Sequence, residues 1–555
     1  MPRDAKKKRI EILPASKTPI DPADSPKIAL SGQIVTMDSS FTVIKNGVVY
    51  MDKGSVVAVT ANGAAKPPGF DDISEIDTQG TIFPGFIELH NHLAYNILCL
   101  WNVPKKYGNR GQWQGSVDYH NLVSGPMMVL GKSPGVVPAI VRYVECKSMF
   151  GGVTTSQGIR LVSNAQTPSY FAGLVRNVEN SGDPALPSAG ALIADADTKD
   201  PSTFLADLKK KSCYLIHLSE GVDDSARKHF LALQFRPNTW AIAPALSGIH
   251  CNALTEDDFH VMASKGASMV WSPLSNFLLY GGTAKADAAK REGLRMGMGS
   301  DWAPSGSKNL LGELKVAKVT SAQMGGFLSD RDVVALATKN AAEILRWDHA
   351  VGSIEKGKRA DLTVWSGKHT DPYGALIGAH ETDLKLVVIN GVPRYGDSTL
   401  MKKLGVGGES VKVGGHSRTL FLTQKTASEP VTKISLADAT ATLTESLKDL
   451  PNHASKRKSL SSTGAPLLAR AGARNEGWVL ALDEVTPTGM DVRPHLPFDG
   501  ELTMPVVKGG TLSAVQLKSL KLDPLTVADD SDFLDTIQSE MNVPQFLKTG
   551  LKTLY

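Results

Sequence analysis

Short apolar runs rich in β-branched residues flank the central part of the chain on both sides. These runs are separated by Asn-Gly and Lys-Gly dipeptides, and they cover residues 28–38, 43–61, 351–365 and 384–396. Runs of this length that are bounded by such dipeptides predict β-hairpins. We therefore expect residues 27–84 and 350–400 to build one composite β-sandwich module.

Between these flanks the pattern changes to short apolar strands that end at polar residues and alternate with helical segments. The strands are expected within residues 81–93, 150–157, 188–197, 213–221, 240–254, 266–276 and 294–303. One connecting helix is bounded by its own sequence, because Thr255 and Asp258 can form a capping box and Gly266 can end the helix. This alternation predicts βαβ units and a parallel sheet, so we expect an α/β fold, with residues 85–349 forming a (β/α)8 TIM barrel.

The two ends of the chain follow different patterns. Residues 405–555 contain a helix-like stretch at 434–450 and an amphipathic stretch at 530–554, and we expect an appended α/β domain without recognisable chemistry. Residues 1–26 are basic at first and rich in proline. Their run Lys6-Lys7-Lys8-Arg9 is compatible with a nuclear address, but a flexible solvated tail is the simpler interpretation.

Composition narrows the possible partners. The 60 Lys and Arg residues exceed the 56 Asp and Glu residues by only four, which gives no argument for a nucleic acid or an anionic membrane. No run of 18 apolar residues predicts a membrane span.

The cysteines form no C-x-x-C pair, so neither a disulfide scaffold nor a thiolate zinc site is indicated. We expect a cytoplasmic protein with a small-molecule substrate, and homo-oligomer formation stays open. The four cysteines are Cys99, Cys146, Cys213 and Cys251.

Five metal-capable residues fall at or just past the expected strand ends: His90, His92, His217, His250 and Asp301. His217 follows His90 by 127 positions and precedes His250 by 33, which are about four repeats and one repeat of an eight-fold barrel of ~250 residues. This spacing puts the residues on strands 1, 5, 6 and 8, at the face where barrel active sites lie.

Strand alternation points His90 and His92 to one side, so both imidazoles can bind one metal ion. With His217 and Asp301 they give three nitrogens and one oxygen, with a position left open for water. This set suits one divalent Zn or Fe ion that generates hydroxide near neutral pH, with Zn favoured. A lone buried histidine is more often a hydrogen-bonded core residue, but several at matching strand ends favour a metal site.

Two further residues complete the expected chemistry. Glu220 follows His217 by three positions, where it can face the activated water and shuttle a proton. His250 can hold the water or polarise a developing oxyanion rather than bind the metal. The alternatives are an ion pair at the surface or behind the metal ligands for Glu220 and a structural hydrogen bond for His250.

The sequence resembles the metal-dependent amidohydrolases over roughly residues 28–400. The segments that carry the resemblance are PGFIELHNH, GGVTT, HLSE, GSD and AAEILRWDHAVGSIEKGKRADLTVW. Glu three residues after the strand-5 His, together with a fourth strand that lacks lysine, resembles the mononuclear branch. That branch includes cytosine, guanine and S-adenosylhomocysteine deaminases and triazine hydrolases. By this resemblance His90, His92, His217 and Asp301 bind the metal, Glu220 shuttles protons, His250 orients water or polarises the substrate, and Asp301 also accepts a proton.

The resemblance implies an enzyme that cleaves a non-peptide carbon–nitrogen bond by metal-activated hydroxide. The substrate is expected to be a small nitrogenous, heterocyclic compound that loses ammonia or an amine. An amidase, a cyclic amidase or a dehalogenase using the same site is the alternative, and a non-catalytic scaffold is a weaker one.

The segment after the first barrel strand, residues 94–116, departs from the deaminase pattern because it is rich in aromatic residues. Trp101, Trp113 and Trp302 could stack on a planar substrate, and Arg110 could meet an anionic group. Packing of a covering segment explains the same residues equally well.

Overall fold

The computed structural model describes residues 25–131, 133, 135–158, 161–162, 173–181, 183–195, 200–424, 429–454, 479–480 and 517–555. The basic tail predicted for residues 1–26 lies almost wholly outside the described residues. Outside them also lies the end of the predicted strand 188–197.

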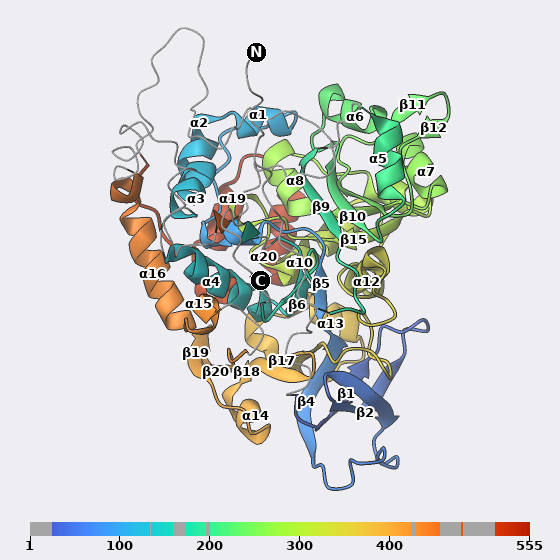
Figure 1. Ribbon diagram of the computed structural model, residues 1–555, viewed down its shortest axis with the longest axis vertical. Coiled ribbons are helices and arrows are strands. Elements are labelled where there is room, and N and C mark those ends of the chain that lie inside the picture. The colour runs from blue at the N-terminus through green and yellow to red at the C-terminus, as the bar shows by residue number, and fades with distance from the viewer. Residues whose placement is uncertain are drawn as a thin grey trace, which may run out of the picture.

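A nine-stranded sheet combines strands from both flanks of the chain (Figure 1). Its spatial order is β19-β20-β18-β17-β16-β4-β1-β2-β3, and β4 pairs with β16 in antiparallel register across the join. The two flanks therefore share one sheet, and β19 and β20 extend it past residue 405. The sandwich character and the domain limits stay predictions. The strands are β1 (Ile28–Val35), β2 (Val43–Asp52), β3 (Ser55–Ala61), β4 (Glu75–Pro84), β16 (Leu362–Ser366), β17 (Leu384–Ile389), β18 (Val392–Asp397), β19 (Glu409–Val413) and β20 (His416–Leu420).

The central part of the chain forms two parallel sheets, with the orders β5-β6-β8 and β15-β14-β13-β10-β9. Backbone contacts join them on both sides. A parallel bridge pairs Asn91, after β5, with Asp301, after β15, and the Ala189 amide donates to the Val178 carbonyl between β8 and β9. The strands are β5 (Phe86–Glu88), β6 (Val153–Ser156), β8 (Arg176–Asn177), β9 (Gly190–Asp195), β10 (Tyr214–Leu218), β13 (Leu246–His250), β14 (Ser268–Trp271) and β15 (Arg295–Met298).

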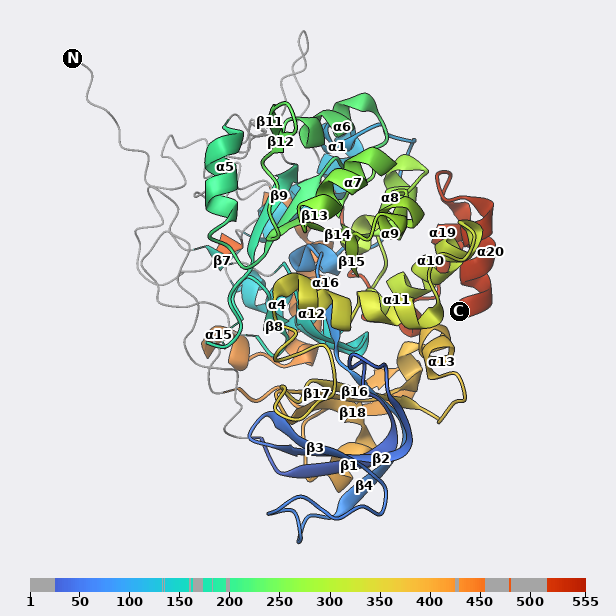
Figure 2. The same cartoon turned by 90° about the vertical axis from the view of Figure 1, so that its right-hand side faces the viewer.

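Helices alternate with these strands, which is the mixed α/β pattern expected from the sequence (Figure 2). The capping box of α7 is confirmed, since the Thr255 hydroxyl accepts from the Asp258 amide and the Asp258 carboxylate accepts from the Thr255 amide. The helices are α4 (Val136–Phe150), α5 (Pro201–Leu208), α6 (Asp224–Leu231), α7 (Glu256–Ser264), α8 (Pro273–Tyr280), α9 (Ala286–Arg291), α10 (Leu310–Gln323), α11 (Asp330–Leu336) and α12 (Lys339–Leu345).

The apolar run 81–93, expected as one strand, is divided between two sheets. Its beginning belongs to β4 of the nine-stranded sheet, whereas Phe86–Glu88 forms β5. Gly85 lies at the division, and a Cβ there would meet the Thr154 side chain at 2.2 Å. His90 and His92 therefore lie beyond the end of β5 rather than inside a strand.

The part of the chain beyond residue 405 packs onto the central part. Helix α16 (Leu436–Lys448) lies beside α4 (Figure 1), where the Arg142 guanidinium donates to the carbonyl oxygens of Val431 and Ile434. Helices α19 (Phe533–Ser539) and α20 (Gln545–Leu554) lie near α10 (Figure 2). Within the described residues, no helix combines the length and apolar character that a bilayer span requires.

The remaining described elements connect these layers. They are η2 (Leu93–Ile97), α1 (Arg110–Gln114), α2 (Val117–Tyr119), η3 (His120–Ser124), α3 (Gly125–Leu130), β7 (Leu161–Val162), β11 (Gln234–Arg236), β12 (Thr239–Trp240), η4 (Ala303–Ser305), α13 (Pro372–Gly378), η5 (Glu381–Asp383), α14 (Ser398–Lys403), α15 (Glu429–Thr432), β21 (Val479–Leu480) and η6 (Val527–Asp529).

Glu145 on α4 gives a testable pH effect on stability. Burial raises the pKa of its carboxyl group to about 7, although Arg142 opposes the shift. A carboxyl pKa that is raised by folding contributes stability that is complete below the unfolded pKa and is lost as the pH rises through the folded pKa. From pH 5 to pH 8 we expect the wild type to lose up to about 3 kcal/mol more free energy of unfolding than Glu145→Gln.

Urea denaturation followed by tryptophan fluorescence, repeated across this pH range for both proteins, measures the difference. Other titrating groups are present in both proteins, so their effects cancel. Parallel curves for wild type and variant would contradict the shifted pKa.

Candidate metal centre

The residues singled out by their spacing lie at the carboxyl ends of four parallel strands. His90 and His92 follow β5, His217 lies within β10, His250 is the last residue of β13, and Asp301 follows β15 shortly after its end. All five side chains are buried. Strand ends from distant parts of the sequence therefore bring one carboxylate and four imidazoles together.

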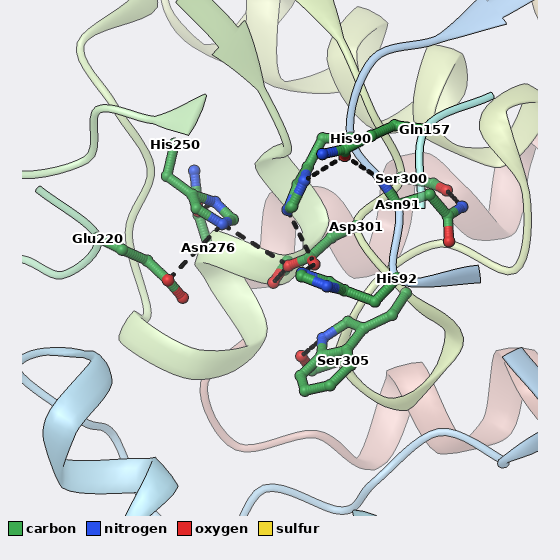
Figure 3. Close-up of polar contacts among 12 residues, drawn as sticks. His90, Asn91, His92, Gln157, Glu220, His250, Asn276, Ser300, Asp301 and Ser305 are labelled. Atoms are coloured by element: carbon green, nitrogen blue, oxygen red, sulfur yellow. Dashed lines mark hydrogen bonds and ion pairs between the residues drawn. The ribbon is translucent and has the colours of Figure 1, made fainter. Parts of the chain in front are cut away.

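Asp301 lies at the middle of this cluster (Figure 3). Its Oδ1 atom lies 3.1 Å from Nε2 of His90 and 3.2 Å from Nε2 of His92. The Ser275 hydroxyl donates to Oδ2 at 2.6 Å. Burial alone would raise the pKa of Asp301, but His90 and His92 hold it well below its usual range. The cluster therefore presents an ionised carboxylate.

The candidate ligand atoms form two overlapping groups, in each of which all atoms lie within 4.8 Å of one another. One group consists of His90, His217 and His250, and the other of His90, His92 and Asp301. The ring centroid of His217 lies 4.7 Å from that of His90 and 5.4 Å from that of His92. The four predicted ligands thus span both groups, and His250 lies among them.

Hydrogen bonds fix how two of the imidazoles face the cluster. His90 contacts Gln157 Oε1 through Nδ1 at 3.2 Å, and His250 contacts Asn276 Oδ1 through Nδ1 at 2.9 Å. Because an amide oxygen only accepts, these contacts assign the proton to Nδ1 and leave Nε2 toward the cluster. Both Nε2 atoms are buried and make no well-directed hydrogen bond.

These observations fit a divalent cation. Inward-facing imidazole nitrogens without a hydrogen-bond donor, beside a buried carboxylate, are the donor atoms that zinc or iron prefers. Burial also lowers the pKa of His90 to about 4 and that of His217 well below its usual value, with Arg110 adding to the effect at His217. Neutral imidazoles have a lone pair available for a metal ion.

Backbone strain accompanies the strand ends. Ser219, His250, Cys251 and Asp301 all have positive φ values, between 53° and 66°. Non-glycine residues in this region cost about 1–3 kcal/mol each and concentrate at functional sites. Two of these strained residues, His250 and Asp301, contribute side chains to the cluster.

Glu220 lies beside the cluster, where Tyr280 and Arg110 donate hydrogen bonds to its carboxylate. Its Oε1 accepts from the Tyr280 hydroxyl at 2.8 Å, and its Oε2 accepts from Arg110 Nη1 at 3.1 Å. The Tyr280 hydroxyl itself accepts from Trp113 Nε1 at 2.7 Å. His250 Nε2 lies 3.9 Å from Glu220 Oε2 and 3.8 Å from Asp301 Oδ2, between the two carboxylates (Figure 3).

Aromatic rings cover the cluster. The Trp302 ring lies 5.2 Å from that of His92, and the Trp113 ring lies 6.0 Å from that of Trp302. Trp101 lies further out, against Tyr119 at 6.1 Å. Of the residues predicted to bind substrate, Trp302 and Trp113 thus belong to this layer. Trp101 contacts it through the Tyr119 ring. Arg110 instead pairs with Glu220.

The segment that carries these rings is fastened across the strand ends. The Val222 amide donates to the Gly108 carbonyl at 2.7 Å, and an antiparallel bridge pairs Asn109 with Gly221. Gly221 has a φ of +144°, and a Cβ there would meet the Gly108 carbonyl oxygen at 2.5 Å. Only glycine allows this close approach of the two backbones.

The sequence did not identify several residues that contact the cluster. Gln157, Ser275 and Asn276 lie at the ends of expected strand segments, so strand-end position was the available signal. Tyr280 had no such position, since it is the last residue of helix α8 and lies 60 residues after Glu220, which it contacts in the folded chain.

Comparisons with known proteins agree on one superfamily. A sequence model of the Amidohydrolase family matches residues 242–394. A 5-methylthioadenosine/S-adenosylhomocysteine deaminase of Symbiobacterium thermophilum is 24% identical over 66% of this chain and 92% of its own length. The corresponding deaminase of Desulforudis audaxviator is 30% identical, over 26% of this chain and 36% of its own length.

Solved structures show the same fold. A triazine hydrolase variant superposes with a TM-score of 0.53 at 19% identity, covering 66% of this chain and 94% of its own. The zinc complex of atrazine chlorohydrolase from Arthrobacter aurescens TC1 superposes with a TM-score of 0.52 at 18% identity, with the same coverage. Together, these similarities support a member of the metal-dependent amidohydrolase superfamily.

Matched amide variants separate metal binding from proton transfer. We expect Asp301→Asn to weaken zinc binding by more than about 10-fold, because it removes an anionic ligand. Glu220→Gln removes a carboxylate from the same buried cluster but leaves the predicted ligands in place, so the bound metal should stay. Elemental analysis after gel filtration measures both. Loss of metal from Glu220→Gln and retention by Asp301→Asn would reverse the assignment.

Proposed function

We propose that the protein is a metal-dependent hydrolase that cleaves a non-peptide carbon–nitrogen bond in a small nitrogenous, heterocyclic compound and releases ammonia or an amine. The observation that carries this proposal is the convergence of Asp301, four histidines and Glu220 at the ends of parallel strands. The related deaminases and the zinc-containing chlorohydrolase support it.

The fold that positions this site is, in our proposal, a closed (β/α)8 barrel. Its eight strands are β5, β6, β8, β9, β10, β13, β14 and β15, taken in chain order. The Asn91–Asp301 bridge and the hydrogen bond from Ala189 to Val178 support closure between the two parallel sheets. This count puts His217, His250 and Asp301 on strands 5, 6 and 8.

One divalent ion, zinc ahead of iron, would be held by His90, His92, His217 and Asp301. Such an ion lowers the pKa of water and supplies hydroxide at neutral pH. A mononuclear site is supported by the absence of lysine from the segment 188–197, where the binuclear branch carries one.

Glu220 is the proton shuttle in this mechanism. It takes a proton from the attacking water and delivers it to the departing nitrogen, which then leaves as ammonia or an amine. The hydrogen bond from Tyr280 and the ion pair with Arg110 occupy one carboxylate oxygen each and fix the orientation of the group. Tyr280 keeps its proton at neutral pH, because burial and then Glu220 raise its pKa well above the usual value.

His250 polarises the substrate or orients the attacking water. Its Nε2 atom lies between Asp301 and Glu220, at 3.8 and 3.9 Å. Asn276 holds the ring by its other nitrogen, and its own amide group donates to Thr283. The hydrogen bond to Thr283 fixes the Asn276 amide group, and the fixed amide oxygen in turn holds the His250 ring in one orientation.

The aromatic layer supplies the substrate contacts in this proposal. Trp302 and Trp113 would stack on a planar ring, with Trp101 further from the metal ligands. Arg110 already pairs with Glu220, so a role in binding an anionic substrate would require it to exchange this partner. A small-molecule substrate, a cytoplasmic location and the option of a homo-oligomer complete the proposal.

Hydrolysis of a carbon–halogen bond is the second candidate reaction, because the chlorohydrolase shares the fold. An amidase or cyclic amidase would use the same residues. A non-catalytic scaffold is disfavoured because it would be free to lose the metal-binding residues and Glu220. This chain retains all of them, and they are buried.

A substrate panel tests the proposed reaction. We expect zinc-loaded protein to release ammonia from at least one aminated heterocycle, such as a purine nucleoside or an aminotriazine, as measured by a coupled glutamate dehydrogenase assay. Chloride release from chlorinated triazines would favour the second candidate, and ring opening of cyclic amides would favour the amidase. Zinc-loaded protein that is inactive on all three groups would oppose the proposal.

Two variants test the proton shuttle. Glu220→Gln should lower kcat by at least about 100-fold with the metal retained, because general acid–base catalysis typically contributes this much. Tyr280→Phe removes the hydrogen bond from Tyr280 but leaves the ion pair of Glu220 with Arg110, so a smaller loss of kcat with an unchanged metal content is expected. Equal and undiminished kcat values in both variants would exclude Glu220 as the shuttle.

A further inference from the structure

The segment that begins at residue 517 lies directly against the part of the chain that follows the first two predicted ligands. Leu522 pairs with Leu98 in an antiparallel bridge, and the Asp523 amide donates to the Ile97 carbonyl at 3.0 Å. These contacts join the C-terminal segment to η2, which begins one residue after His92. The two partners are more than 400 positions apart in the sequence.

A buried ion cluster reinforces this contact. Asp523 accepts from Lys147 on α4 through one carboxylate oxygen and from Lys308 through the other, the latter at 2.7 Å. Lys308 also pairs with Asp530 at 2.7 Å. Asp523, Lys147 and Lys308 are at most 4% exposed, and the four charges balance.

Lys147 has a further partner that leads to the metal centre. Its ammonium group donates to the Asn96 carbonyl at 2.8 Å. The Asn96 side chain donates to Asn91 Oδ1 at 3.0 Å and accepts from the Ala303 amide at 2.8 Å. Asn91 in turn donates to the Ser300 hydroxyl at 3.1 Å.

These residues alternate with the predicted ligands along the chain. Asn91 lies between His90 and His92, and Ser300 directly precedes Asp301 (Figure 3). Asn96 therefore ties the segment after β5 to the segment after β15, and Lys147 holds the backbone of Asn96 in place. The path from the C-terminal segment to the ligand-bearing backbone consists of hydrogen bonds between buried groups.

We propose that Asp523 is a positioning residue of the metal centre, acting through Lys147 and Asn96 on the segments that carry His90, His92 and Asp301. This inference rests on the proposed function, because it assumes that those side chains bind the metal. The C-terminal segment, for which the sequence indicated no chemistry, thereby helps to position the residues of the proposed metal centre.

The chemistry of the cluster favours positioning over simple stabilisation. Buried ion pairs contribute little net stability, since the cost of desolvating the charges offsets their attraction, and apolar residues of similar volume often serve as well. Their directional hydrogen bonds do fix the relative position of the groups they join. Removing a residue that supports metal ligands through hydrogen bonds, without binding the metal itself, typically weakens metal affinity by about 10–100-fold.

The test uses the full-length chain with zinc as the probe. Asp523→Asn removes the charge that holds Lys147. Asp530→Asn is the matched control, because it removes the same charge from the same segment and from the shared partner Lys308 but does not contact Lys147. Competition with a chromophoric chelator gives the zinc dissociation constant, and circular dichroism at the same temperature verifies that each protein is folded.

We expect Asp523→Asn to raise the zinc dissociation constant about 10-fold while Asp530→Asn leaves it unchanged. Unchanged affinity in Asp523→Asn, or equal weakening in both variants, would overturn the inference. A wild type that binds no zinc would instead contradict the proposed function itself. If Asp523→Asn does not fold, the double variant Lys147→Met/Asp523→Asn keeps the remaining charges balanced and is judged by the same outcomes.

Discussion

The buried carboxylate of Asp301 is the constraint on which the arrangement of the strand ends depends. A charge without partners in the interior costs several kcal/mol, so partners must converge on it. His90 and His92 reach one oxygen from the end of β5, and Ser275 donates to the other from the start of α8. Asp301 itself has a left-handed backbone conformation that only its surroundings can maintain. Burial, charge and strain at one residue thus determine where three separate segments must meet.

The surroundings that maintain this arrangement extend well beyond the strands. Gln157 and Asn276 each occupy the outer nitrogen of an imidazole, and Tyr280 orients Glu220. Asn96 connects the segments that follow β5 and β15, and its carbonyl accepts from Lys147 of α4, which pairs with Asp523 of the C-terminal segment. The proposed metal centre needs ligands fixed to a fraction of an ångström, and the buried polar groups around the cluster form a network suited to that requirement.

The sequence predicted the alternating α/β pattern and the residues of the cluster because both depend on local periodicity and repeat length. Positions 90, 217, 250 and 301 follow the repeat of a βα unit, and parallel strands carry such positions to one face. The same reasoning failed where tertiary contacts decide. The run 81–93 reads as one strand, but the close approach of Gly85 to Thr154 divides it between two sheets. Tyr280 contacts Glu220 from helix α8, and Asp523 contacts Lys147 from the C-terminal segment. The positions of these two residues follow no repeat in the sequence.

X-ray absorption at the metal edge of the purified protein tests the central claim most directly, since it reports the atoms around the ion without requiring a substrate. The proposed ligands His90, His92, His217 and Asp301 predict one ion with three imidazole nitrogens at about 2.0–2.1 Å and oxygen ligands at about 2.0–2.2 Å. No second metal should appear at about 3.5–4 Å. A metal–metal distance in that range, or a shell of sulfur ligands, would contradict the mononuclear centre.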